Sequence, residues 1–151
     1  MNVNPFDIRQ ALLEKHAQHV VLIHFPIALF TAGVGFDFAA QWRKSRMLAA
    51  AAYYNFAVAA AAAVPVVASG LLAWQLQLGG GKLKGILLLH LVLGIVSSAM
   101  IGVIWFVHFR SRLSLELVLP AYRVPLELLG VAVIALTAHL GGFLSGVNIP
   151  S

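Results

Sequence analysis

No cysteine occurs in the 151-residue chain, and only 10% of its residues are charged. The missing cysteines exclude disulfides, thiolate metal sites, iron–sulfur clusters, a cysteine nucleophile and covalent attachment of a c-type haem. The shortage of charge excludes a soluble globular domain, in which about a quarter of the residues are charged. Because 61% of the residues are hydrophobic, most of the surface must face lipid.

The chain also lacks the motifs of common enzyme classes, namely a Walker loop, a dinucleotide fingerprint, a Ser-His-Asp set and a metalloprotease motif. Enzyme activity by this chain alone is therefore the function class with the least support. The net charge of +5 would suggest nucleic acid in a soluble protein. Here the basic residues lie in short segments between apolar runs, so we expect no nucleic-acid partner.

Four apolar segments are each long enough to cross a hydrocarbon core, which takes about 20 helical residues. They predict transmembrane helices at about 20–40, 48–76, 83–109 and 121–144, within a single domain of residues 1–151. The expected fold class is all-α, an integral membrane four-helix bundle. Before the first span, apolar and polar residues alternate from Phe6 to Lys15, which predicts a short amphipathic helix at the membrane interface.

The basic residues predict an orientation in the membrane. Six of them lie in the first and third connections and four lie near the N-terminus and in the second connection: Arg43, Lys44, Arg46, Arg110, Arg112 and Arg123, against Arg9, Lys15, Lys82 and Lys84. By the positive-inside rule, this excess places the first and third loops in the cytoplasm and both termini on the outer side.

Histidine is unexpectedly common in so apolar a chain, with six residues: His16, His19, His24, His90, His108 and His139. Ionisable side chains inside a membrane are rare, and a functional role is the default hypothesis for them. His24, His90 and His139 each lie one to two turns from the outer end of a predicted helix. Because neighbouring helices run antiparallel, these three imidazoles are expected at nearly one depth.

Small residues continue the helix faces of these histidines. Gly94 follows His90 by one turn, and Gly142 lies beside His139. Small residues let helices, or a flat cofactor, approach closely, so we expect the imidazoles to face the bundle interior. Two interpretations follow: a haem b held by two of the three histidines, or histidines without a cofactor that are interfacial or bonded to neighbouring helices. The pattern does not select the ligand pair, and copper in place of haem stays open.

A second polar group is predicted near the cytoplasmic side, formed by Asp37, Asn55, Arg123 and Glu127. Arg123 and Glu127 are four residues apart and can pair along one helix. Mainly Ala, Val and Leu separate this group from the outer histidines, with Ser97 and Ser98 the exceptions. We therefore interpret it as an anchoring polar layer and not as a transport path.

The remaining histidines are interpreted as interfacial side chains. His108 lies 18 residues beyond His90, near the cytoplasmic side, and is expected at the interface beside Arg110. His16 and His19 are three residues apart, which suits a copper or zinc site. We favour a hydrated interfacial pair for these two.

The segment 19–29, HVVLIHFPIAL, resembles the first-helix motif of a bacterial membrane family designated domain of unknown function 2231, with Val20 in place of the usual proline. Further similarities are Asp37, Ser69-Gly70 near the end of the second helix, His90, and the closing run His139-Leu140-Gly141-Gly142-Phe143-Leu144. Ser145 and Gly146 depart from the family's usual Val-Tyr continuation. The resemblance spans nearly the whole chain and implies four transmembrane helices in a bacterial inner membrane.

Members of this family occur joined to Rieske or c-type cytochrome domains, which suggests respiratory electron transfer. The resulting hypothesis is a cytochrome b-like subunit with one haem b near the outer, periplasmic side, held by two of His24, His90 and His139. It includes membrane or periplasmic redox partners of the cytochrome c or Rieske type, and a quinone at the rim beside the third histidine. The alternatives are a cofactor-free accessory subunit packed in a larger complex and, with less support, a small transporter.

Overall fold

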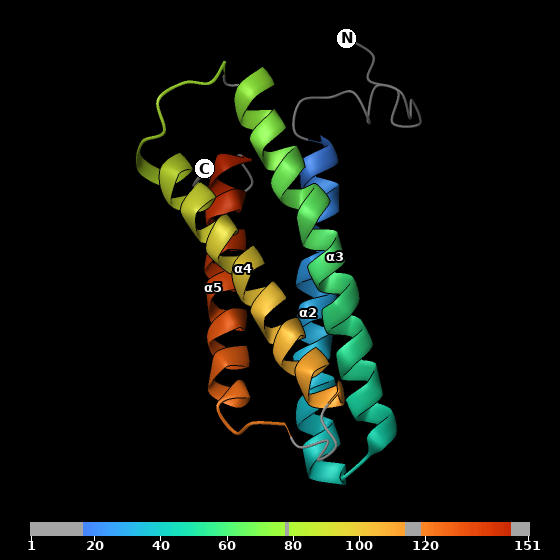
Figure 1. The fold of residues 1–151 in the computed structure, drawn as a ribbon. Helices are drawn as coiled ribbons and strands as arrows, with labels where there is room; N and C mark the ends of the chain where they lie inside the picture. The colour runs from blue at the N-terminus through green and yellow to red at the C-terminus, as the bar shows by residue number, and fades with distance from the viewer. Residues whose placement is uncertain (1–16, 78, 114–118, 146–151) are drawn as a thin grey trace, which may run out of the picture.

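The computed structural model describes residues 17–77, 79–113 and 119–145 of the chain. Within these residues the chain forms four helices and no strand, and Figure 1 shows their arrangement: α2 (Ala17–Arg43), α3 (Arg46–Gln77), α4 (Gly85–Leu113) and α5 (Arg123–Leu144). All four are long and apolar enough to cross a membrane. The expectation of an all-α membrane bundle is confirmed, whereas the predicted N-terminal interfacial helix lies outside the described residues.

The predicted spans are correct in number and order, but most of the helices extend beyond them. Helix α2 continues to Arg43, and α4 includes Arg110 and Arg112 in its last turn. A positive charge is favourable beside the carbonyl end of a helix, so the helices continue past the apolar residues into basic ones. Helix α5 begins at Arg123, whose backbone N–H bonds Pro120 O in the preceding turn.

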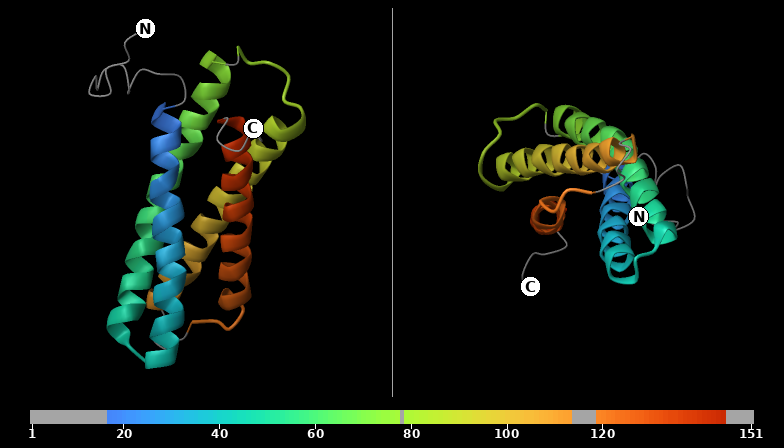
Figure 2. Two further views of the ribbon diagram at one scale, coloured as in Figure 1. Left: turned by 180° about the vertical axis from the view of Figure 1, so that it is seen from behind. Right: turned by 60° about the horizontal axis from the view of Figure 1, so that its bottom comes forward.

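The bundle consists of two antiparallel helix pairs. Helix α2 packs along α3, α4 packs against α5, α3 joins the two pairs through α4, and α2 touches α5 only sparingly. Figures 1 and 2 show that α2 begins and α5 ends on the same side. We call this side the terminal end of the bundle, and the opposite side, where Lys44 turns α2 into α3 with a positive φ of 50°, the loop end.

The buried core contains residues from every helix. Phe30 of α2 and Phe56 of α3 are completely buried, with their ring centroids 5.5 Å apart. Ile104 of α4 and Ile134 of α5 belong to the same cluster. In a bilayer, helices associate mainly through close packing and polar contacts, because lipid is as apolar as the side chains themselves. The aromatic pair therefore provides the surface on which all four helices meet.

Glycine at position 33 lets α2 approach α3 closely. A Cβ atom built on Gly33 would lie 2.7 Å from the Phe56 ring, whereas one built on Gly35 would meet nothing within 4 Å. We expect Gly33→Ala to lower the free energy of unfolding by about 1–3 kcal/mol, because the rigid ring must shift. Gly35→Ala, on the same helix, is the matched control and is expected to be neutral or to stabilise by up to about 1 kcal/mol through helix propensity.

The measurement is unfolding by sodium dodecyl sulfate titration in mixed micelles, followed by circular dichroism. Equal effects of Gly33→Ala and Gly35→Ala would contradict the close packing of α2 on α3.

Candidate functional sites at the two ends of the bundle

His24 lies on α2, two turns from the start of the helix at the terminal end. Its side chain is exposed, and its Nδ1 atom lies 2.7 Å from the carbonyl oxygen of Val20, one turn back. Only a protonated Nδ1 can donate to a carbonyl, so this bond leaves the Nε2 lone pair available. His19, one turn before His24, is held differently, with its Nδ1 2.9 Å from Ser69 Oγ on α3.

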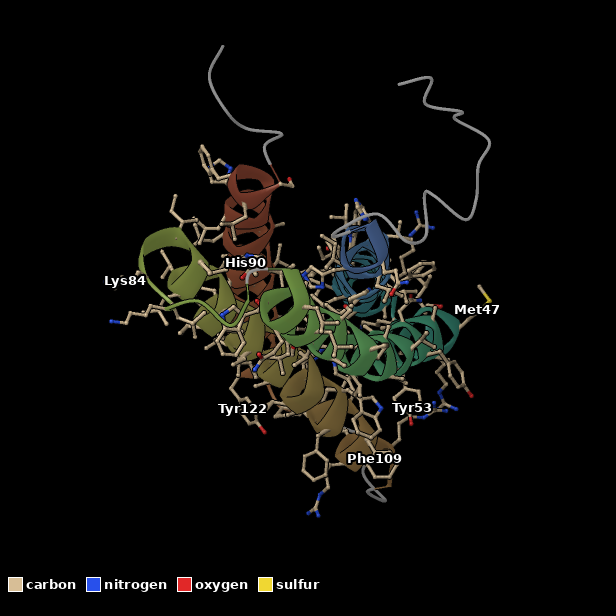
Figure 3. The ribbon with its side chains drawn as sticks, turned by 90° about the horizontal axis from the view of Figure 1, so that it is seen from above. Met47, Tyr53, Lys84, His90, Phe109 and Tyr122 are labelled. Atoms are coloured by element: carbon tan, nitrogen blue, oxygen red, sulfur yellow. The ribbon has the colours of Figure 1, made fainter. Side chains whose placement is uncertain are left out.

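His90 lies between α4 and α5 at the terminal end. Its half-buried ring places Nδ1 3.1 Å from the carbonyl oxygen of Thr137. A Cβ atom on Gly141 would lie 3.1 Å from the ring, so the glycine that makes room for His90 is Gly141, and the predicted Gly142 is its half-buried neighbour. Viewed from above in Figure 3, His90 lies among the helices, whereas Tyr122 and Met47 lie at the outside.

His139 lies on α5, between one and two turns before the helix ends at Leu144. Its side chain is exposed, and its ring meets Phe143 edge to face with centroids 5.0 Å apart. The three imidazoles thus lie one to two turns from the same end of the bundle, as their positions in the helices dictate. The expected inward orientation applies only to His90, because α2 and α5 touch sparingly and do not cover His24 and His139.

The loop end contains a different set of polar residues, and this set is buried. Asp37 of α2 is 1% exposed and Arg123 of α5 is 7% exposed. The Arg123 Nε atom donates to Asp37 Oδ2 over 3.1 Å, and Gln41 Nε2 donates to the same oxygen over 2.8 Å. The Arg123 Nη1 atom also donates to Pro120 O over 3.3 Å. Arg123 therefore ties α2 to the turn that starts α5.

His108 of α4 and Glu127 of α5 complete this set. They are 3% and 0% exposed, and His108 Nε2 lies 2.9 Å from Glu127 Oε1. The His108 ring packs on Phe56 of α3, with centroids 4.7 Å apart. Ligand-type atoms of Asp37, His108 and Glu127 lie within 4.8 Å of one another, and in the described part of the chain no other three His, Cys, Asp or Glu residues do so. We call Asp37, His108, Arg123 and Glu127 the buried charge cluster.

The cluster corrects the interpretation of His108 as an interfacial residue beside Arg110. Ile101 and Ile104 are also buried, and His108 continues their helix face at the next turn. This spacing, together with the acid Glu127 on a neighbouring helix, is the signal in the sequence that indicates a buried His108. The spacing of Arg123 and Glu127 allows them to pair with each other, but in the structure each bonds a residue on another helix.

Asn55, the remaining residue of the predicted polar group, and two threonines of the bundle bond carbonyl oxygens of their own helices. Asn55 Nδ2 donates to Ala51 O over 2.9 Å and takes no part in the cluster contacts that the structure describes. Thr31 and Thr137 donate to carbonyl oxygens one turn back, at Ile27 and Val133. Thr137 also lies 3.0 Å from Ser97 Oγ and so joins α5 to α4.

The fold and its two polar regions define a multi-pass helical membrane protein. The family described as "Predicted membrane protein (DUF2231)" matches residues 15–147. The chain belongs to this family, which confirms the resemblance found in the sequence. Comparisons with curated proteins and with solved structures find no match.

Proposed function

We propose that this protein is a membrane electron-transfer subunit, cytochrome b-like, that binds one haem b at the terminal end through two of His24, His90 and His139. The haem would supply one-electron chemistry that the side chains of the chain lack. The supporting observation is the bonding of two imidazoles, because His24 and His90 each have Nδ1 on a backbone carbonyl. A ring N–H donated to a backbone carbonyl fixes the orientation of an imidazole, is typical of metal-binding histidines and leaves Nε2 for iron.

The residues at the terminal end fit such a group. Neutral imidazoles are common axial ligands of haem iron, and the chain offers them on three helices. Gly94 lies one turn after His90, and the absence of atoms within 4 Å of a Cβ built there leaves room for a flat ring. The rings of His24 and His139 are exposed, so their side chains are accessible to a bound macrocycle.

The proposal also covers the orientation of the protein in the membrane and its redox partners. The distribution of Lys and Arg favours a terminal end that faces the periplasm of a bacterial inner membrane. A periplasmic c-type cytochrome or a Rieske-type subunit would then exchange electrons with the haem from that side, and a quinone would bind at the rim beside the third histidine.

The test is a dithionite-reduced minus oxidised visible spectrum of the full chain, purified in detergent without other subunits. We expect Soret and α bands of a low-spin b-type haem. Two of three single variants should lose the low-spin spectrum, and the third should keep it: His24→Ala, His90→Ala and His139→Ala. His19→Ala is the matched control, since Ser69 holds this ring against α3 at the same end, and it should keep the bands.

A flat spectrum from folded protein, with metal analysis also empty, would overturn the proposal. Bound copper without haem would overturn it equally, because the ligands would then serve a different metal.

The second candidate is a cofactor-free accessory subunit that packs against a larger membrane complex. The observation in its favour is the open space beside both Gly94 and Gly102, two turns apart on one face of α4. Small residues in such a row let a partner helix approach. Under this alternative, leucine at both positions would abolish co-purification with the complex, and the spectrum would stay flat with or without His90.

A further inference from the structure

The buried charge cluster at the loop end plays no part in the proposed haem site, and its charges do not balance. With both carboxylates ionised, Arg123 charged and His108 neutral, the cluster carries one net negative charge. All four side chains are buried, and an uncompensated charge in a low-dielectric interior is strongly disfavoured. The cluster therefore requires one further positive charge.

The two carboxylates differ in how well they are satisfied. Asp37 Oδ2 accepts hydrogen bonds from both Arg123 and Gln41. Glu127 has Oε1 beside His108, but its buried Oε2 has no hydrogen-bond partner among the described residues. An ionised carboxylate spreads its charge over both oxygens, so an orphaned Oε2 makes ionisation of Glu127 costly. A neutral acid leaves only a carbonyl oxygen unpaired, which costs less.

We propose that Glu127 is held as a neutral carboxylic acid whose Oε1–H donates to His108 Nε2, and that the buried charge cluster is a binding site for one exchangeable proton. A carboxylic acid can stay neutral at neutral pH when an apolar site surrounds it and its proton is used in a hydrogen bond. Charge balance favours the proton over a divalent metal, because a doubly charged ion would leave the cluster with one net positive charge.

The groups around Glu127 come from all four helices. Helix α2 brings Asp37 and Gln41, α4 brings His108, and α5 brings Arg123. Helix α3 contributes the Phe56 ring against His108, and within the described residues no α3 side chain bonds to the cluster. The missing charge is thus not supplied by a neighbouring helix. Asp37 lies less than two turns from the end of α2, so the proton should exchange with water at the loop end.

Infrared spectroscopy of the full chain in lipid nanodiscs at neutral pH tests the proposal. We expect the C=O stretching band of a protonated carboxylic acid, shifted by ¹³C-labelled glutamate and shifted again in D₂O. Glu127→Gln, which keeps the side-chain shape, should remove the band completely, whereas Glu14→Gln should leave it unchanged. The absence of the band from folded wild-type protein would overturn the proposal, as would its persistence in the folded Glu127→Gln variant.

Two further variants test the charge balance itself. Asp37→Asn leaves Arg123 to balance an ionised Glu127, so the band should disappear. Arg123→Gln leaves both acids without a cation, so the band area should rise about twofold as a second proton binds. An unchanged band in both variants would contradict a site governed by charge balance. The cation of the sample buffer can also be changed from choline to sodium. If the wild-type band then disappears, the cluster binds a sodium ion, and the proposal of a proton site is overturned.

Discussion

Replacing Arg123 by methionine is expected to lower the free energy of unfolding by about 3–5 kcal/mol, because Asp37 loses its buried partner while its own burial is unchanged. The two side chains are 7% and 1% exposed and bond over 3.1 Å between α5 and α2. Methionine retains much of the length of the arginine side chain, so the decrease in the free energy of unfolding comes mainly from the missing charge. The measurement is unfolding by dodecyl sulfate titration in mixed micelles.

The double variant Asp37→Leu with Arg123→Met tests whether the lost stability comes from the unpaired charge. Replacing both members of a buried ion pair by apolar residues is often neutral or stabilising, so the double variant should recover most of the lost stability. Arg112→Met is the matched control: this arginine is exposed and lies 4.3 Å from the Tyr53 ring, and its loss should cost about 1 kcal/mol or less. A double variant as unstable as Arg123→Met would show that the pair is required for more than charge compensation.

Replacing Phe56 by alanine is expected to lower the free energy of unfolding by about 3 kcal/mol, the lower end of the range for buried aromatic residues. Phe56 is completely buried and contacts Phe30 and His108. The lower end applies because lipid or detergent also solvates an apolar ring, so the loss comes from the cavity and the missing contacts. The same dodecyl sulfate titration measures it.

Val58→Ala is the control on the same helix. Val58 is 53% exposed, and detergent can fill the space that its methyl groups leave, so the change should cost less than about 0.5 kcal/mol. Similar losses from Val58→Ala and Phe56→Ala would contradict the assignment of Phe56 to the centre of the bundle.

Hydropathy alone predicted the number and order of the helices, because the length of an apolar run decides whether it can cross a bilayer. The first motif of the chain likewise indicated the family. The prediction of helix ends was less accurate, because α2 begins at Ala17 and continues to Arg43, beyond the expected span of 20–40. A basic last turn extends a helix beyond its apolar residues, and hydropathy does not register it.

The positions of single side chains were only partly predictable. The depth of His24, His90 and His139 follows from the rise of the helix, but which of them points inward does not. A transmembrane helix is apolar all round, so its sequence carries little of the periodic contrast that marks the buried face of a soluble helix. For this reason His108 was expected at the interface, although it is 3% exposed.

By itself, the sequence determined that this protein is a four-helix membrane bundle of a recognisable family, with His24, His90 and His139 near one end and Asp37, Arg123 and Glu127 near the other. Only the tertiary structure decided the partners of those residues. Arg123 and Asp37 are separated by 86 positions, and His108 and Glu127 by 19. Such pairs form only when each helix has taken one rotation about its own axis, and packing around Phe30 and Phe56 selects that rotation.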